Sequence, residues 1–222
     1  MRKIEFANEE YYHIFNRGVD KRKIFLDTQE YDRFLLAMQL LNDKEDGLMI
    51  KWRDYKKANP SAKLEAFLKR SFRKQEPLVE IIAYCLNPNH YHFILKQIED
   101  SGIERFMHKI GTSYTKYFNK KNKRSGVLFQ GVFKSVHIDS NEYLLYLSAY
   151  VNKNNFIHDY NKDDNWSYSS LLDYLGEEKS GLVKMNAVLG QFKNVNEYKE
   201  FLKNNALHMK ERKEMEEYLI EE

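Results

Sequence analysis

Four polar side chains stand at spacings that could support chemistry. His90 and His92 alternate within a strand-like segment, so both imidazoles project from the same face of that strand. Such a pair can bind one metal ion at two neighbouring coordination positions. Tyr150 and Asn154 are four residues apart in a helical segment, which puts a phenol and an amide on one helix face. Together the pairs could supply a nucleophile and three ligands for a cation.

Each pair also has a simpler interpretation. His90 and His92 can be two hydrogen-bonded surface histidines, because a lone His-x-His pattern is a weak signal. Tyr146 shares the helical segment with Tyr150, and tyrosines at helical spacing commonly pack a core, so spacing leaves both phenols eligible. The remaining histidines lack partners at ligand spacing and receive no role: His13, His108, His137, His158 and His208.

The elements that must position these side chains alternate between strands and helices. Alternating and β-branched patterns predict strands over 10–16, 78–86, 90–96 and 127–138. Helical spacing predicts a helix capped by Thr28, a second over 101–122, and a third from the cap Ser140 to about Asn155. This order predicts an α+β fold, a ferredoxin-like antiparallel sheet with helices on one face, plus C-terminal helices.

The domain organisation follows from changes in composition along the chain. Residues 1–165 are expected to form one main domain, in which the charged segment 43–76 is a surface insertion with a short helical pattern. Residues 166–222 are expected to form a C-terminal helical extension. Its last part, from Val195, is charged and amphipathic, which is more typical of a packing or dimer element than of a DNA reader.

Composition sets bounds on location and partners. A 222-residue chain that is 42% hydrophobic can bury a sizeable core. The formal charge of +3, from 36 basic and 33 acidic residues, is too mild to identify a nucleic-acid binder. The single cysteine, Cys85, excludes an intramolecular disulfide and a Cys-rich zinc site. Without an apolar leader or a long apolar stretch, the sequence predicts a cytoplasmic protein that does not span a membrane.

Several strings of residues occur together in a recognisable order. The chain resembles the REP-associated branch of the single-tyrosine HUH transposases, which are insertion-sequence transposase-like enzymes, over about residues 10 to 175. The strings that carry the resemblance are Tyr12–Gly18 (YHIFNRG), Asn87–His92 (NPNHYH), Gly126–Gly131 (GVLFQG) with Phe133–Ser135 (FKS), Tyr150–Asn155 (YVNKNN) and Trp166–Ser170 (WSYSS).

The resemblance implies roles for particular residues. Tyr150 matches the catalytic tyrosine, His90 and His92 match the ligand pair, and Asn154 matches the polar ligand one helical turn later. One departure is Asn155, where family members commonly have proline. Residues 1–165 would then be an HUH transposase-like catalytic domain. It would cut and rejoin single-stranded DNA through a covalent 5′-phosphotyrosine.

The residue types agree with this chemistry. Two imidazoles and one amide oxygen leave coordination positions for phosphate oxygens, so a divalent metal, Mg²⁺ or Mn²⁺, could act as a Lewis acid. Imidazole ligands favour Mn²⁺ somewhat. A tyrosine has a pKa of about 10, so Tyr150 must lose its proton as it attacks. The covalent link keeps the bond energy, and a second strand end could be joined without ATP.

A set of basic residues is the expected DNA-binding surface. Four of them follow the first strand, and one lies just before the nucleophile helix: Arg17, Lys21, Arg22, Lys23 and Lys134. All could contact phosphates, and the alternative is a solvated basic loop. Three aromatic residues, Phe15, Tyr84 and Phe129, could stack on unpaired bases, although core packing is the commoner use of such residues.

The leading hypothesis is therefore metal-dependent cleavage and joining of single-stranded DNA, with a hairpin as the recognised element and a homodimer as a possible assembly. The alternative is a domesticated, non-catalytic protein that binds hairpin nucleic acids, and the intact set of Tyr150, His90, His92 and Asn154 argues against it. An RNA-binding ferredoxin-like module would need an aromatic RNA-reading motif, which the strands lack.

Overall fold

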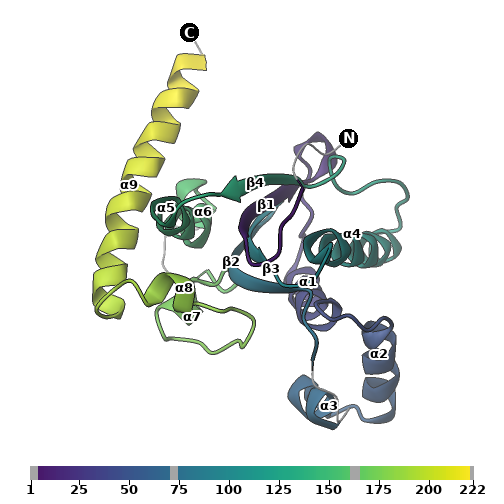
Figure 1. Ribbon diagram of the computed structural model, residues 1–222. Coiled ribbons are helices and arrows are strands. Elements are labelled where there is room, and N and C mark those ends of the chain that lie inside the picture. Colours follow the sequence, from purple (N-terminus) through teal and green to yellow (C-terminus); the bar gives the residue numbers. More distant parts are fainter. Residues whose placement is uncertain (1–4, 71–74, 161–165, 221–222) are drawn as a thin grey trace.

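A four-stranded antiparallel sheet forms the centre of the molecule. The computed structural model describes residues 5–70, 75–160 and 166–220. The strand order is β2-β3-β1-β4 (Figure 1), which is the order of a ferredoxin-like sheet and confirms the predicted fold class. The strands are β1 (Tyr11–Arg17), β2 (Val79–Asn87), β3 (His90–Gln97) and β4 (Lys134–Ile138).

The register of the central strands fixes which side chains share a face. On β1, Phe15 pairs with His92 of β3 on one side and with Lys134 of β4 on the other. Arg17 pairs with His90 in the same way. Because paired residues in antiparallel strands point to the same face, these five side chains form two adjacent rows across the sheet.

The two helices that connect the strands cover one face of the sheet. They are α1 (Thr28–Leu41) and α4 (Gly102–Lys121), which pack on each other and on the rings of Tyr91 and Phe93 (Figure 1). The predicted cap at Thr28 is wrong by one residue. Asp27 is the N-cap, because its side chain accepts a 3.1 Å hydrogen bond from the Glu30 amide.

The other face is covered by the later helices. They are α5 (Asn141–Asn152), α6 (Asn154–Ile157), α7 (Leu171–Tyr174), α8 (Asn186–Leu189) and α9 (Val195–Ile220). Ser140 caps α5 as predicted, because its hydroxyl accepts a 3.2 Å hydrogen bond from the Tyr143 amide. Contrary to the prediction, α5 ends at Asn152, because the backbone of Lys153 leaves helical geometry (φ −106°, ψ 12°).

The chain after residue 165 runs along the outer edge of β2. The Leu86 amide donates to the Tyr168 carbonyl at 2.8 Å, and the Lys184 amide donates to the Ile81 carbonyl at 2.8 Å. The predicted domain boundary adjoins residues 161–165, which lie outside the described residues. The chain from Tyr168 to Lys184 therefore continues the hydrogen bonding of the sheet beyond β2.

Two other predicted segments differ in detail. The insertion contains two helices, α2 (Leu48–Ala58) and α3 (Leu64–Arg70), whose apolar residues form a small cluster with Leu40 of α1. Of the insertion, residues 71–74 lie outside the described part. The strand predicted over 127–138 is confined to β4, and residues 127–133 form a loop in which Gly131 has a φ of +68°.

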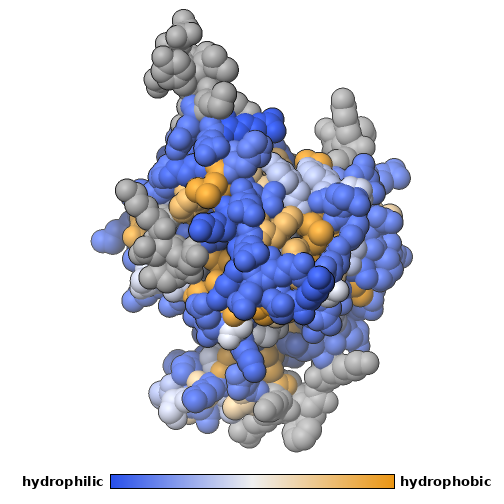
Figure 2. Space-filling model, turned by 90° about the vertical axis from the view of Figure 1, so that its left-hand side faces the viewer, coloured by the Kyte–Doolittle hydropathy of each residue, from blue (hydrophilic) through white to orange (hydrophobic). Residues whose placement is uncertain are grey.

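The surface and the helix lengths bear on membrane association. In the described part of the chain, no helix combines the length and the apolar character needed to cross a bilayer. The side of the molecule that carries α9 is mostly hydrophilic, and its hydrophobic areas are separated by polar residues (Figure 2). Cys85 is buried within β2, as its apolar surroundings in the sequence predict.

Candidate active site

The α5 side of the sheet brings the four predicted site residues together. The rings of His92 and Tyr150 are 5.4 Å apart and nearly perpendicular. The rings of His90 and His92 are 5.1 Å apart. The Oδ1 atom of Asn154, at the start of α6, lies 3.0 Å from Nε2 of His90. Asn154 thus belongs to α6 and not to α5, and its amide still lies beside the imidazole of His90.

The partners of His90 define where its lone pair points. Its Nδ1 lies 2.7 Å from Oδ1 of Asn89, and an amide oxygen can only accept, so Nδ1 carries the proton. The unprotonated Nε2 therefore faces Asn154 Oδ1, which is also an acceptor. Nδ2 of Asn87 lies 3.0 Å from that Nε2 and 2.6 Å from that Oδ1, so its hydrogens can satisfy both atoms. Both lone pairs thus face the Asn87 amide nitrogen.

His92 is held by a third histidine. Its Nδ1 lies 2.8 Å from Nε2 of His13, on the neighbouring strand β1. Burial lowers the pKa of His13 to about 4 and lowers the pKa of His92 well below its usual value. Both rings are neutral at pH 7, so one nitrogen of the pair donates and the other accepts. When His92 donates from Nδ1, its Nε2 lone pair is available to a ligand.

Burial also keeps the neighbouring imidazoles uncharged. It lowers the pKa of His90, and this effect is partly offset because the protonated ring could donate a hydrogen bond to Asn154. It lowers the pKa of His158, whose ring lies 5.2 Å from that of His90, to about 4. At neutral pH the group of histidines therefore presents lone pairs and not positive charges.

Tyr150 occupies a different environment from the other phenols of α5. Burial raises the pKa of Tyr150, and the nearby Asn154 amide partly offsets this effect. Its ring is also 6.1 Å from that of His13. Tyr146 is 37% exposed and makes no ring contact with a histidine within the described residues. The structure thus places Tyr150 beside the histidines, which spacing alone could not decide.

The donor set fits a divalent cation. It offers two neutral imidazole nitrogens and one amide oxygen. Across residues 5–70, 75–160 and 166–220, no three His, Cys, Asp or Glu side chains gather at metal-binding distances. Binding at this position would therefore depend on Asn154 as the third ligand.

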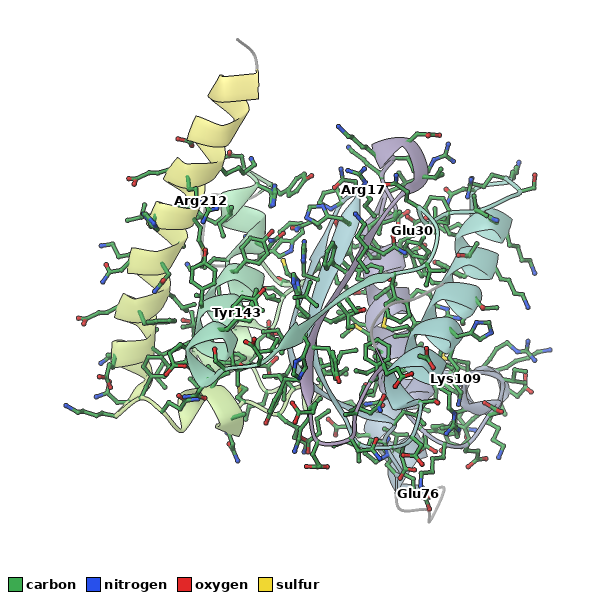
Figure 3. All side chains as sticks on the ribbon, turned by 45° about the horizontal axis from the view of Figure 1, so that its top comes forward. Arg17, Glu30, Glu76, Lys109, Tyr143 and Arg212 are labelled. Carbon is green, nitrogen blue, oxygen red and sulfur yellow. The ribbon has the colours of Figure 1, made fainter. Side chains whose placement is uncertain are left out.

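The predicted DNA-binding residues fall into two groups. Arg17, at the end of β1 (Figure 3), hydrogen-bonds Gln130 and is paired in register with His90. Lys134 is exposed at the start of β4, and its Nζ lies 6.0 Å from the ring centre of Phe15. The exposed run Lys21, Arg22 and Lys23 lies in the turn after β1.

Sequence reasoning missed His13 and Asn87. His13 received no role because it has no partner at ligand spacing in the sequence, and its contact with His92 depends on the pairing of β1 with β3. The sequence did offer one signal: His13 and Phe15 are two residues apart in a predicted strand, so their side chains share one face of the sheet. Asn87 lies between the strands predicted over 78–86 and 90–96 and received no role, whereas its amide contacts both His90 and Asn154.

One family of known proteins matches the region of this chain that contains all four site residues. Residues 52–154, a little under half of the chain, match the family described as IS200-like transposase. No curated protein matches the chain. Among solved structures, a REP-associated tyrosine transposase bound to a REP hairpin aligns with a TM-score of 0.50 and 15% identity, over 83% of this chain and 88% of that one.

At this identity the structural likeness shows a shared fold. The family match covers His90, His92, Tyr150 and Asn154. The resemblance found in the sequence is thereby confirmed, and over residues 52–154 this chain is similar to the IS200-like transposases.

Proposed function

We propose that this protein cuts and rejoins single-stranded DNA next to a hairpin, through a transient covalent bond to Tyr150. The observation that carries the proposal is the position of the Tyr150 phenol beside the neutral imidazole of His92, next to which His90 faces the Asn154 amide oxygen. The transposase family match supports DNA cleavage as the activity. The hairpin bound by the structural relative supports a hairpin as the recognised element.

A divalent cation is part of the proposal. His90 and His92 through Nε2, and Asn154 through Oδ1, would hold Mg²⁺ or Mn²⁺, which would supply Lewis-acid polarisation of the scissile phosphate. Neutral imidazoles favour Mn²⁺ somewhat. His13 orients His92, and Asn89 orients His90, so that both lone pairs point into the site.

The Tyr150 hydroxyl performs the exchange of bonds. Its oxygen forms a bond to phosphorus, and the bond from phosphorus to the 3′ oxygen breaks. The phenol releases its proton, and the departing strand gains one as a 3′-hydroxyl. The number of phosphoester bonds is unchanged, so a second 3′-hydroxyl can reverse the attack without an energy source. Because the pKa of Tyr150 is raised, its proton must leave during the attack.

The two rows of side chains across the sheet, Arg17 with His90 and Lys134 with Phe15 and His92, would lie along the DNA that leads to Tyr150. Arg17 lies next to His90, and Lys134 lies two strands from His92 with Phe15 between them. These cations would neutralise phosphates on either side of the reacting one. Phe15 is half-buried, stacks on the rings of His13 and His92, and would help to hold Lys134 toward the DNA.

The experiment that tests the proposal is covalent capture. The protein is mixed with Mn²⁺ and end-labelled single-stranded DNA that contains a hairpin, and a denaturation-resistant adduct is measured. We expect an adduct with the wild type and with Tyr146→Phe, and none with Tyr150→Phe. The two substitutions remove the same hydroxyl from neighbouring turns of α5.

The opposite pattern would assign the nucleophile to Tyr146. Hairpin binding by the wild type with no adduct in either Mn²⁺ or Mg²⁺ would favour the non-catalytic binding protein instead. His92→Ala should weaken cleavage more than it weakens hairpin binding, because His92 would contact the cation and not the bases. Equal loss of both would contradict a role in metal binding.

A further inference from the structure

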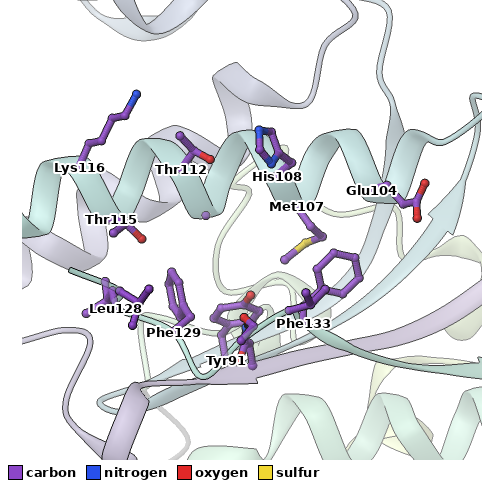
Figure 4. Close-up of a pocket in the computed structure, with 15 residues that line it drawn as sticks. Tyr91, Glu104, Met107, His108, Thr112, Thr115, Lys116, Leu128, Phe129 and Phe133 are labelled. Carbon is purple, nitrogen blue, oxygen red and sulfur yellow. Dashed lines mark hydrogen bonds between the residues drawn. The ribbon is translucent and has the colours of Figure 1, made fainter. Parts of the chain in front are cut away.

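The two faces of the sheet differ in how the helices pack on them. On one face, a groove of about 940 Å³ separates α4 from the loop over residues 127–133, and Met107 and Phe129 line it (Figure 4). On the other face, α5 lies between the sheet and α9 (Figure 1). Contacts with α9 and with the chain before α7 can therefore control how the helix that carries Tyr150 is turned against the sheet.

A chain of buried polar side chains connects α5 to its neighbours. Its members come from three segments and are all 0% exposed: Ser148 and Asn152 of α5, Ser170 just before α7, and Tyr198 of α9. Buried polar groups need hydrogen-bond partners, because those that lack them destabilise the fold. The partners of these four side chains therefore restrict how the three segments can lie against one another.

Ser170 links α5 to the backbone of β2. Its Oγ accepts a 2.9 Å hydrogen bond from the Tyr84 amide, and its own amide donates to the Tyr84 carbonyl at 2.9 Å. A serine hydroxyl has one proton to donate. The nearer acceptor is Oδ1 of Asn152 at 2.6 Å, whereas the Tyr84 carbonyl is 3.3 Å away. Asn152 is therefore attached to β2 through a single side chain.

Tyr198 links the same asparagine to α9. Nδ2 of Asn152 donates to the Tyr198 hydroxyl at 2.9 Å. The Ser148 hydroxyl donates to the Leu145 carbonyl at 2.7 Å, so its oxygen can accept the Tyr198 proton at 3.4 Å. Ser148 and Asn152 are one turn apart and share a face of α5. The hydrogen bonds thus run in one direction, from the β2 backbone through α5 to α9 and back to α5.

The network lies close to the reacting groups along the chain. Asn152 is two residues after Tyr150 and two before Asn154, and it is the last residue of α5. Successive residues turn by about 100° around a helix, so Asn152 and Tyr150 point to nearly opposite sides of α5. Rotation of α5 by about 10° would move a side-chain tip about 6 Å from the helix axis by about 1 Å. Misplacement of that size can slow a reaction by about 100-fold.

Hydrogen bonds are suited to fixing such a rotation. Apolar side chains can pack in several orientations, whereas a chain of hydrogen bonds with assigned donors and acceptors is satisfied in one arrangement. Two strings of the sequence meet in this network, because Asn152 belongs to Tyr150–Asn155 and Ser170 belongs to Trp166–Ser170. The chemistry proposed above uses neither residue, so the network gives both of them a task.

We propose that Asn152, Ser170 and Tyr198 are positioning residues, which set the rotation of α5 and thereby hold the Tyr150 phenol in place beside His92. The inference rests on the proposed function, because it assumes that Tyr150 is the nucleophile. These residues would act on the reaction only through α5, and would contact neither the DNA nor the cation. Loss of the network should therefore slow the covalent step and leave DNA binding unchanged.

The matched pair of variants is Tyr198→Phe and Tyr174→Phe. Each removes one buried phenolic hydroxyl, and the two rings are 5.2 Å apart. The Tyr198 hydroxyl bonds to Asn152 of α5, whereas the Tyr174 hydroxyl donates to the Ile82 carbonyl of β2 at 3.0 Å. Both variants lose a buried hydrogen bond, but only Tyr198→Phe loses a bond to α5. The rate of adduct formation at saturating hairpin DNA and Mn²⁺ is measured beside the hairpin affinity.

We expect Tyr198→Phe to lower this rate by about 10- to 100-fold and to leave the hairpin affinity at the wild-type value. Tyr174→Phe should leave both at the wild-type values. Asn152→Leu should slow the step to a similar extent as Tyr198→Phe. Combining Asn152→Leu with Tyr198→Phe should add little to either, because both substitutions interrupt one network.

A second readout does not depend on DNA. A fluorine label on the Tyr150 ring reports the surroundings of that ring through its NMR resonance in the protein alone. Tyr198→Phe should move this resonance, and Tyr174→Phe should leave it in place. If Tyr198→Phe does not fold, Ser170→Ala, which removes the bond to Asn152, is judged by the same two readouts.

The outcomes separate this inference from the proposed function. If the wild type forms no adduct, the proposed function fails and the inference fails with it. If the wild type forms the adduct but Tyr198→Phe matches Tyr174→Phe in rate and in resonance, the inference alone is wrong. Loss of rate and of hairpin affinity by the same factor would also overturn it, because general loosening of the fold would then explain the effect. The inference requires both the slower step and the moved resonance.

Discussion

The Nε2 atom of His13 on β1 lies 2.8 Å from Nδ1 of His92 on β3, and both rings are buried. This hydrogen bond crosses between the two central strands of the sheet. The other nitrogen of His92 takes no part in this bond, and the His92 ring lies 5.4 Å from that of Tyr150. His13 is therefore a positioning residue that would act on the reaction only through His92.

Replacement of His13 should weaken metal binding. His13→Phe keeps a ring but removes the partner of His92, and we expect Mn²⁺ affinity and adduct formation to fall by about 10- to 100-fold. His13→Gln keeps a polar atom for His92 and should recover part of the loss. Calorimetric titration with Mn²⁺ measures the affinity directly. The control is His137→Asn, since His137 is exposed on β4 and pairs with Glu10. Wild-type affinity in His13→Phe would show that the contact has no role in orienting His92.

The rate of covalent capture should increase with pH. Burial raises the pKa of Tyr150 above its ordinary value of about 10, so the fraction of phenolate grows about tenfold per pH unit between pH 7 and pH 9. The histidines do not oppose this trend, because their lowered pKa values keep them neutral throughout that range. Single-turnover adduct formation with Mg²⁺ at constant ionic strength gives the profile. A rate that is flat or falls over this range would mean that loss of the phenol proton does not limit the step.

Lys134 should contribute to affinity without contributing to sequence preference. We expect Lys134→Gln to weaken binding to different hairpins by similar factors and to reduce the slope of log affinity against log salt by about 1. Fluorescence anisotropy at several salt concentrations measures both effects. Lys57→Gln, which removes an exposed charge from α2, should leave the slope unchanged. An altered preference among hairpins would indicate that Lys134 contacts bases.

The tight turn after β1 should depend on Gly18. A Cβ atom at residue 18 would lie 2.2 Å from the carbonyl oxygen of Arg22, which is backbone and cannot rotate away. Gly18→Ala should therefore lower the free energy of unfolding by about 1–3 kcal/mol. Gly111→Ala is the control, because its Cβ meets open space in a helix and should raise stability by about 0.5–1 kcal/mol. Urea unfolding compares the two, and a Gly18→Ala protein as stable as the wild type would mean that the turn rearranges at no cost.

The central fold could be predicted because its local patterns agree with its tertiary packing. The side chains of the strand that contains His90 and His92 alternate between the two faces of the sheet, and most of them are buried. The strands predicted over 78–86 and 90–96 match β2 and β3 to within one residue at each end. His13 of β1 was not predicted to be a site residue. Its contact with His92 is a consequence of strand register, which no spacing along the chain reveals.

The segment before β4 shows where local patterns mislead. Residues 127–133 include Val127, Leu128 and Phe129, which have the composition of a strand. In the structure they form one wall of the groove beside α4, and the positive φ of Gly131 bends the chain away from the sheet. Likewise, Tyr146 and Tyr150 are equivalent by spacing, and only the rotation of α5 on the sheet distinguishes them.

The covering of β2 by the chain after residue 165 has a consequence for self-association. Backbone groups on the outer side of β2 already bond to Tyr168, Ser170 and Lys184. The other border of the sheet is β4, a five-residue strand on which Val136 and His137 are exposed. A foreign strand that extended the sheet would therefore have to add at β4, directly beside Lys134, where a positively charged and short edge discourages such recruitment.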